Sequence, residues 1–170
     1  LMAVARRVVE ADRYVRNGNW KVAWHPSMML GHDIFGATLG IIGAGRIGQA
    51  MARRGRGFNM PILYSSSTPK PEFEQECGAT RVDLETLLKK SDFVSLHVPL
   101  TDSTRLLIDK ERLQLMKPTA YLINNARGPV VDEQALYEAI KTKKLAGAAL
   151  DVFCIEPTTA DNPLLELDNV

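Results

Sequence analysis

TLGIIGAGRIG, residues 38–48, joins a short apolar run to a Gly-rich loop. The apolar run has the composition of a buried strand, and residues 49–56 after the loop suit a helix. Gly43, Gly45 and Gly48 form the pattern G-x-G-x-x-G. Between a strand and a helix, this pattern is typical of a loop that binds the pyrophosphate of a dinucleotide.

Each of the three glycines has a separate physical reason to be there. Gly43 permits a tight turn, Gly45 lets the backbone approach the pyrophosphate, and Gly48 lets the helix pack close to the strand. The free N–H groups at the start of the helix, together with the helix dipole, favour a bound anion. The alternative interpretation is an ordinary Gly-rich turn without a ligand.

Length and composition exclude several classes of protein. The chain of 170 residues is 45% apolar and 24% charged, as expected for one globular domain. A net charge of +1 gives no field for a nucleic acid or a membrane surface. We therefore interpret the basic cluster Arg53, Arg54 and Arg56 as a solvated helix face. No apolar run is long enough to span a bilayer.

The two cysteines indicate a reducing environment. Cys77 and Cys154 have neither CxxC nor zinc-site spacing, so we expect a cytoplasmic location, two inert thiols and no metal site.

The N-terminal part, residues 1–36, is predicted to be a helical arm and loop. A helix is expected from Met2 to Gly18, and Trp20 and Trp24 follow in a Pro-containing loop. The apolar positions of the helix are Val4, Val8, Val9 and Val15. Local packing and a contact with a second subunit both explain this arm, and a contact of the second kind would make the protein a homodimer.

From residue 37 onward, strand and helix patterns alternate. The expected strands are 38–43, 60–65, 79–82, 92–97, 119–124 and 146–151. The expected helices are 46–57, 71–77, 83–90, 109–116 and 132–143. Short apolar strands separated by helices predict an α/β fold with a doubly wound parallel sheet of order 3-2-1-4-5-6, the Rossmann dinucleotide-binding architecture. Ligands of such sheets bind beyond the carboxyl ends of the strands.

The residues after the second expected strand bear on the choice between NAD and NADP. NAD sites usually carry an acidic residue about 20 positions beyond the glycines, but this chain has Ser66, Ser67 and Thr68 there, followed by Lys70. Hydroxyls and an ammonium can donate to a 2′-phosphate. We expect NADP(H) to be favoured, with NAD(H) as the alternative if the turn discriminates little.

Two further strand ends carry candidate residues. His97, Val98 and Pro99 follow the fourth strand, and Val98 and Pro99 are candidate contacts of the cofactor. His97 could act as a general acid, but we favour the interpretation that it lines the cofactor trough. Arg127 follows the fifth strand, where a guanidinium can bind a carboxylate in a bidentate fork. Asp132, at the start of the next helix, is expected to be an N-cap.

Two acids, Asp151 and Glu156, follow the sixth strand. A carboxylate at this position could keep a catalytic base protonated, or both acids could simply face solvent.

Together these segments resemble the D-isomer-specific 2-hydroxyacid dehydrogenase family over essentially the whole chain. The matching motifs are GAGRIG at 43–48, LHVPLT at 96–101, INNARG at 123–128 with VDE at 131–133, and LDVF at 150–153 with Glu156-Pro157. Within the family, the Ser/Thr turn is most similar to glyoxylate/hydroxypyruvate reductases.

The resemblance implies a role for each matching residue. Arg127 would bind the substrate carboxylate and carbonyl, and Glu156 would raise the pKa of a catalytic histidine. Asp151 would bind the nicotinamide carboxamide. The remaining cofactor contacts would come from Ala44, Gly45, Arg46 and Ile47 at the pyrophosphate and from Asn125 and Ala126 near the nicotinamide.

The resemblance also implies hydride transfer between NAD(P)H and a small 2-keto acid. The family's catalytic histidine would come about twenty residues after Glu156, and its flavodoxin-like substrate domain would also lie outside this chain. We therefore expect the chain alone to bind cofactor without appreciable turnover. Phosphoglycerate-type or lactate-type specificity, and an NAD(H)-sensing corepressor without catalysis, remain alternatives.

Overall fold

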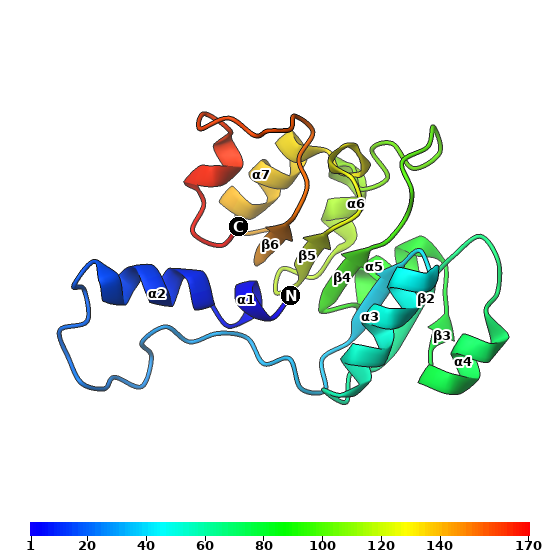
Figure 1. Ribbon diagram of the computed structural model, residues 1–170, viewed down its shortest axis with the longest axis horizontal. Coiled ribbons are helices and arrows are strands. Elements are labelled where there is room, and N and C mark those ends of the chain that lie inside the picture. Colours follow the sequence, from blue (N-terminus) through cyan, green and yellow to red (C-terminus); the bar gives the residue numbers. More distant parts are fainter.

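The computed structural model describes all residues, 1–170, and contains one six-stranded parallel sheet (Figure 1). The strand order β3-β2-β1-β4-β5-β6 confirms the expected doubly wound topology. The strands are β1 (Leu39–Ile42), β2 (Ile62–Ser65), β3 (Thr80–Arg81), β4 (Phe93–Leu96), β5 (Tyr121–Asn124) and β6 (Gly147–Leu150). Each strand lies inside its predicted range, because the outermost predicted residues already belong to the connecting turns.

Helices cover both faces of the sheet. They are α1 (Met2–Ala5), α2 (Val8–Arg16), α3 (Arg46–Arg56), α4 (Pro71–Cys77), α5 (Leu84–Lys90), α6 (Lys110–Leu115) and α7 (Glu133–Lys141), with 3₁₀ turns η1 (Gly128–Val130) and η2 (Pro163–Glu166). From α3 to α7, each helix lies within one or two residues of its prediction. Asp132 is the N-cap of α7 and accepts a hydrogen bond from the Ala135 N–H, as expected.

Two hydrophobic cores, one on each face, hold the layers together. Buried side chains of α5, α6, α7 and η2 form the larger core, and those of α1, α3 and α4 form the smaller one. Neighbouring strand residues alternate between the cores: Phe93 belongs to the smaller and Val94 to the larger. This period of two is what a sheet covered on both faces requires.

The N-terminal arm differs from the single helix that the sequence predicts. Arg7 adopts a left-handed conformation, φ 54°, and separates α1 from α2. The carbonyl oxygen of Ala5, which would continue the helix, instead accepts a hydrogen bond of 2.8 Å from the His32 N–H. The returning loop therefore takes the acceptor that the next helical turn needs. Ala5 is buried in the smaller core, whereas α2 projects from the sheet and buries no residue (Figure 1).

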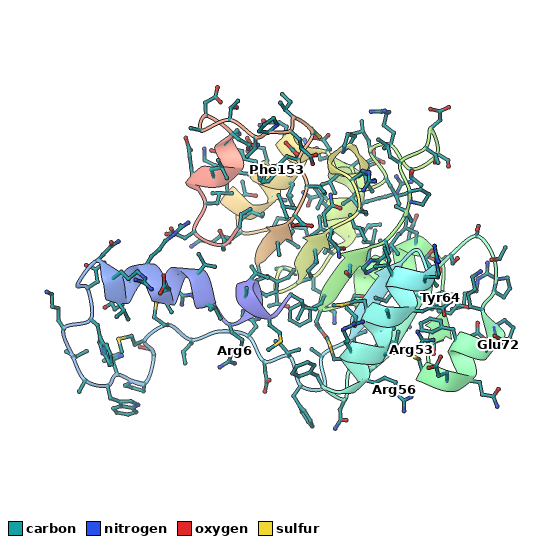
Figure 2. All side chains as sticks on the ribbon, in the orientation of Figure 1. Arg6, Arg53, Arg56, Tyr64, Glu72 and Phe153 are labelled. Atoms are coloured by element: carbon teal, nitrogen blue, oxygen red, sulfur yellow. The ribbon has the colours of Figure 1, made fainter.

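The basic cluster on α3 is partly paired. Arg53 forms a salt bridge with Glu76 on α4, and Arg56 donates to the Glu76 carbonyl; Figure 2 shows both arginines on α3. Pairing within the domain explains the cluster without a nucleic-acid partner. None of the helices has the length and hydrophobicity needed to cross a membrane.

Candidate cofactor-binding site

The sheet register aligns the carboxyl ends of five strands along one edge. Ile42 pairs with both Ser65 and Leu96, Leu96 pairs with Asn124, and Asn124 pairs with Leu150. The residues that directly follow these strand ends therefore come together at the same edge, although they are distant in sequence. They are Gly43, Ser66, His97, Asn125 and Asp151.

The first and third glycines of the loop are required by close backbone contacts. Gly43 has φ 95°, and a β-carbon on it would stand 2.7 Å from the His97 carbonyl oxygen and 2.9 Å from the Val98 side chain. A β-carbon on Gly48 would overlap the carbonyl oxygen of Gly43. Gly48 thus lets α3 start directly against the turn, as the sequence predicts.

Gly45 is different, because a β-carbon on it would meet nothing within 4 Å. Its φ of −78° is open to any residue, so neither strain nor packing explains a glycine here. Gly45 is the N-cap of α3, an eleven-residue helix whose first turn has no side-chain cap. Unoccupied N–H groups beside a space that a side chain would fill suit a dinucleotide pyrophosphate.

The other predicted contacts of the loop flank Gly45 in the chain. Ala44 is buried, and its carbonyl accepts a hydrogen bond of 3.1 Å from the Gln49 side chain. Arg46 is exposed, and Ile47, 69% exposed, is an apolar side chain left open to solvent at the start of α3. An exposed isoleucine beside free N–H groups is consistent with a surface that a bound ligand covers.

The Ser/Thr turn after β2 lies beside a cation that the sequence prediction missed. The guanidinium of Arg81, the last residue of β3, donates through Nη2 to the carbonyl oxygens of Ser66 at 3.0 Å and Ser67 at 3.4 Å. Ser67 and Thr68 are exposed. Arg81 is distant from the glycine loop in sequence, and the pairing of β2 with β3 brings it beside the turn.

His97 lies at the carboxyl end of β4, behind the glycine loop. Its Nε2 lies 2.9 Å from the hydroxyl of the buried Ser95, and its backbone N–H donates to the Ile42 carbonyl at 2.7 Å. Burial lowers the pKa of His97 below its ordinary value of 6.5. A neutral imidazole anchored to the sheet suits the interpretation that His97 lines the trough. Pro99 is exposed, and its carbonyl accepts from the Thr104 hydroxyl.

Asn124, a second residue that the prediction missed, organises the loop after β5. Its side chain is buried, accepts from the Ala126 N–H at 3.1 Å and donates to the Arg127 carbonyl at 3.0 Å. The available signal was an amide at the last position of an otherwise apolar strand. Asn125 is exposed, whereas Ala126 is buried.

Arg127 is exposed at this edge, and its Nη1 donates to the Ala126 carbonyl at 2.6 Å. The next residue, Gly128, lies against the backbone of Phe153, so the loop after β5 and the loop after β6 are in direct contact. Figure 2 marks Phe153 on the side of the molecule away from Tyr64. The two loops form the end of the edge opposite the Ser/Thr turn.

Both predicted acids follow β6 and are exposed. The Asp151 N–H donates to the Asn124 carbonyl at 2.9 Å, which fixes the start of the loop. Glu156 Oε1 accepts from the Phe153 N–H at 2.9 Å, so this carboxylate folds over the backbone that contacts Gly128. The structure thereby brings Arg127 and Glu156 onto neighbouring loops.

The two cysteines are unpaired. Cys77 is buried at the end of α4. Burial, reinforced by Glu133, raises the pKa of the Cys154 thiol to about 11. Cys154 therefore stays protonated near neutral pH, as expected for an inert thiol.

The sheet topology, the glycine loop and the open space at Gly45 define a dinucleotide-binding Rossmann domain. The family model described as "D-isomer specific 2-hydroxyacid dehydrogenase, NAD binding domain" matches residues 1–170. The chain belongs to this family and corresponds to the family's NAD-binding domain.

Curated relatives agree with this assignment. A glyoxylate reductase of Korarchaeum cryptofilum is 62% identical over 170 residues, which are 100% of this chain and 51% of the relative. A glyoxylate reductase of Thermococcus onnurineus is 58% identical over 173 residues, 100% of this chain and 52% of the relative. The chain therefore spans about half the length of these relatives.

Solved structures share the fold. The TT0316 protein from Thermus thermophilus is 50% identical with a TM-score of 0.93, over 99% of this chain and 52% of that one. An acyclic imino acid reductase, Bsp5, in complex with NADPH and D-Arg, is 36% identical with a TM-score of 0.87, and the match covers 99% of this chain and 52% of that one. A D-isomer specific 2-hydroxyacid dehydrogenase from Lactobacillus delbrueckii, in its NAD-complexed form, is 32% identical with a TM-score of 0.84. The match covers 99% of this chain and 54% of that one.

Proposed function

We propose that this chain is the cofactor-binding half of a reductase that transfers hydride between NAD(P)H and a small 2-keto acid, glyoxylate or hydroxypyruvate. The observation that carries the proposal is the contact between the Arg127 loop and the Glu156 loop beside the dinucleotide cradle. The 62% identity to a glyoxylate reductase supports the choice of substrate.

When bound, the cofactor supplies the hydride. Arg127 binds the substrate carboxylate and polarises the carbonyl, because a guanidinium offers several N–H donors in a fixed plane. Asp151 holds the nicotinamide carboxamide, and Asn125 and Ala126 line the same region. Glu156 pairs with a histidine from outside this chain and keeps it protonated, so that it can donate a proton to the developing alkoxide.

A substrate panel on the full-length protein tests this proposal. We expect kcat/KM to be highest for glyoxylate or hydroxypyruvate and lower for pyruvate and phosphohydroxypyruvate. Arg127→Met should lower kcat/KM by about a hundredfold or more, as loss of one transition-state donor does, and leave the cofactor Kd unchanged. Arg54→Met, which removes an exposed arginine in the last turn of α3, away from the glycine loop at the start of that helix, is the control. Tight NADH binding with no keto-acid reduction would instead indicate a sensing module.

The same site favours NADP(H) over NAD(H) in this proposal. Ser66, Ser67 and Thr68 occupy the turn where an acidic residue would repel a 2′-phosphate. We expect kcat/KM for NADPH to exceed that for NADH by about tenfold or more, which corresponds to about 1.4 kcal/mol. A tenfold preference for NADH would refute it.

We also propose that the protein is a homodimer in which α2 contacts a second copy. Val8, Val9 and Val15 on α2 are 54%, 55% and 51% exposed. A mostly apolar pocket of about 520 Å³ lies between the arm and the β6 side of the sheet. An amphipathic helix with exposed valines beside a mostly apolar pocket can form the self-complementary interface of a twofold dimer.

The oligomeric state tests this interface. Val9→Glu, on the pocket wall, should convert a dimer to a monomer in analytical ultracentrifugation. Leu165→Glu introduces the same charge at a comparably exposed apolar residue of η2, outside the arm, and should leave the dimer intact. A monomeric wild type, or a Val9→Glu protein that stays dimeric, would contradict the proposal. The unpaired Cys77 and Cys154 are consistent with the reducing cytoplasm that we propose as its location.

A further inference from the structure

A shallow pocket lies beside the Ser/Thr turn, at the end of the sheet edge remote from Arg127. It has a volume of about 370 Å³ and is lined by Ser65, Ser66, Arg81, Val82 and Asp83. Two of these residues belong to the carboxyl end of β2 and its turn, and three come from the end of β3 and the following loop. The pocket is therefore formed by the outermost strand pair of the sheet.

The position of Arg81 in this pocket is fixed by the backbone. Arg81 is in register with Tyr64 of β2, and the Val82 N–H donates to the Tyr64 carbonyl at 3.0 Å. The guanidinium then reaches the Ser66 and Ser67 carbonyl oxygens through Nη2. These bonds hold the cation against the backbone of the residues whose hydroxyls are proposed to meet a 2′-phosphate.

The remaining donors of Arg81 are available to a ligand. Its side chain is exposed, and Arg81 takes part in none of the six salt bridges of the structure. The two carbonyl bonds use Nη2 alone, and a guanidinium carries further N–H groups on its other nitrogens. Arg81 is therefore a positioned cation without a carboxylate partner.

The nearby carboxylate of Asp83 has partners of its own. Asp83 is the N-cap of α5: its Oδ1 accepts from the Thr86 N–H at 2.8 Å and its Oδ2 from the Thr86 hydroxyl at 2.6 Å. These hydrogen bonds lower the pKa of Asp83, so it stays ionised. The Asp83 carboxylate is hydrogen-bonded to the first turn of α5. The hydrogen-bond donors of the pocket that remain for a ligand are those of Arg81 and the serines.

We propose that Arg81 is the specificity-determining cation that binds the 2′-phosphate of NADPH, together with the hydroxyls of Ser66 and Ser67. The inference rests on the proposed NADP(H) preference and adds the residue that produces it. A guanidinium can bind a phosphate through two parallel N–H···O bonds, which a serine-rich turn alone cannot provide. Arg81 would bind the 2′-phosphate from the end of β3, although an arginine in the turn after β2 could bind the same group.

Dissociation constants for NADPH and NADH, measured by fluorescence titration of the full-length protein, test the inference. Arg81→Gln should weaken NADPH binding by about tenfold or more, as loss of a charge-assisted hydrogen bond does, and leave NADH binding nearly unchanged. Lys90→Gln removes a positive charge at the far end of α5 and should change neither constant. Arg81→Lys, which keeps the charge but not the planar fork, should give an intermediate loss.

Salt dependence separates a phosphate contact from a structural effect. In the wild type, the ratio of NADPH to NADH affinity should fall as ionic strength rises, because the extra phosphate charge is screened. In Arg81→Gln this dependence should largely disappear. A ratio with the same salt dependence in both proteins would overturn the inference.

The outcomes distinguish the inference from the preference on which it rests. A wild type that prefers NADH refutes the NADP(H) preference, whatever the variants do. A wild type that prefers NADPH, with an unchanged preference in Arg81→Gln, refutes only the role of Arg81. Loss of the preference in Lys70→Gln but not in Arg81→Gln would assign the 2′-phosphate contact to Lys70. The backbone N–H of Lys70 donates to the Tyr64 hydroxyl at 2.9 Å.

Discussion

Gly128 lies so close to Phe153 that a β-carbon on the glycine would overlap the carbonyl group of the phenylalanine. The contact joins the loop after β5 to the loop after β6. Arg127 precedes Gly128, and Glu156 accepts a hydrogen bond from the Phe153 N–H, so both candidate catalytic residues lie within one residue or one hydrogen bond of this contact. The contact fixes the loop that carries Arg127 against the loop that carries Glu156.

Gly128→Ala should therefore disturb the two loops together. The added methyl group can be accommodated only if backbone moves, and overpacking of this kind costs about 1–3 kcal/mol of unfolding free energy. Urea unfolding measures the loss. Gly57→Ala is the control: Gly57 has φ −60°, and its β-carbon would stand 3.2 Å from the Arg54 carbonyl oxygen, so we expect a change within about 1 kcal/mol. Equal effects of the two substitutions would contradict the argument.

The stability of the loop after β5 should require an amide at position 124, because the side chain must both donate and accept a hydrogen bond. Asn124→Asp keeps the acceptor for the Ala126 N–H but places a carboxylate oxygen against the Arg127 carbonyl, which Asn124 now contacts as a donor. Because the side chain is buried, we expect a loss of about 1–3 kcal/mol in unfolding free energy. Asn125→Asp, the same change at the exposed neighbour, should cost less than about 0.5 kcal/mol. Similar losses in both would show that Asn124 does not fix the loop.

The fold could be predicted because its signals are local. Strand and helix patterns alternate with the right lengths, and the glycine loop stands at the first strand–helix junction, so the sheet order follows from right-handed crossovers. Within the arm, the prediction of one continuous helix was wrong for the opposite reason. Val4, Val8 and Val15 have helical spacing, but the break at Arg7 depends on His32, twenty-five positions later in the chain.

The positions of the candidate residues were predictable where these residues follow the strand ends in sequence. Arg127, Asp151 and Glu156 are in this class, although the sequence could not tell that Gly128 joins their loops. Arg81 was missed because its contact with the Ser/Thr turn is tertiary, whereas Asn124 was missed although its partners, Ala126 and Arg127, lie only two and three residues further along the chain. In the sequence, Asn124 is only the last residue of an apolar strand. Arg81 approaches the Ser/Thr turn only through the pairing of β2 with β3.

Gly45→Ala and Gly48→Ala should separate ligand binding from folding. A methyl group at Gly45 meets open space, so the free protein should keep its thermal stability, whereas cofactor affinity should fall by about tenfold or more as the methyl enters the pyrophosphate space. At Gly48, the methyl overlaps the Gly43 carbonyl oxygen, so stability itself should fall. Tm without cofactor and Kd for NADPH are measured on both. Unchanged affinity in Gly45→Ala would place the pyrophosphate elsewhere.

His97 should make the protein less stable in mild acid. Burial lowers its pKa in the folded state below the ordinary value of 6.5, so between the two pKa values the unfolded chain binds a proton that the folded chain does not. The contribution of His97 is therefore complete above about pH 6.5 and is lost as the pH falls below it. Urea unfolding between pH 8 and 5 should show a steeper loss of free energy in the wild type than in His97→Asn.

The matched control for this experiment is His25→Asn in the exposed loop. It removes an exposed histidine side chain remote from the sheet, and the stability profile of this variant should follow that of the wild type. Comparing slopes rather than absolute stabilities matters, because His97→Asn also removes the contact with the Ser95 hydroxyl and should lower stability at every pH. Parallel profiles for the wild type and His97→Asn would show that His97 is protonated equally in the folded and unfolded chains, and that it does not sit as a neutral group behind the glycine loop.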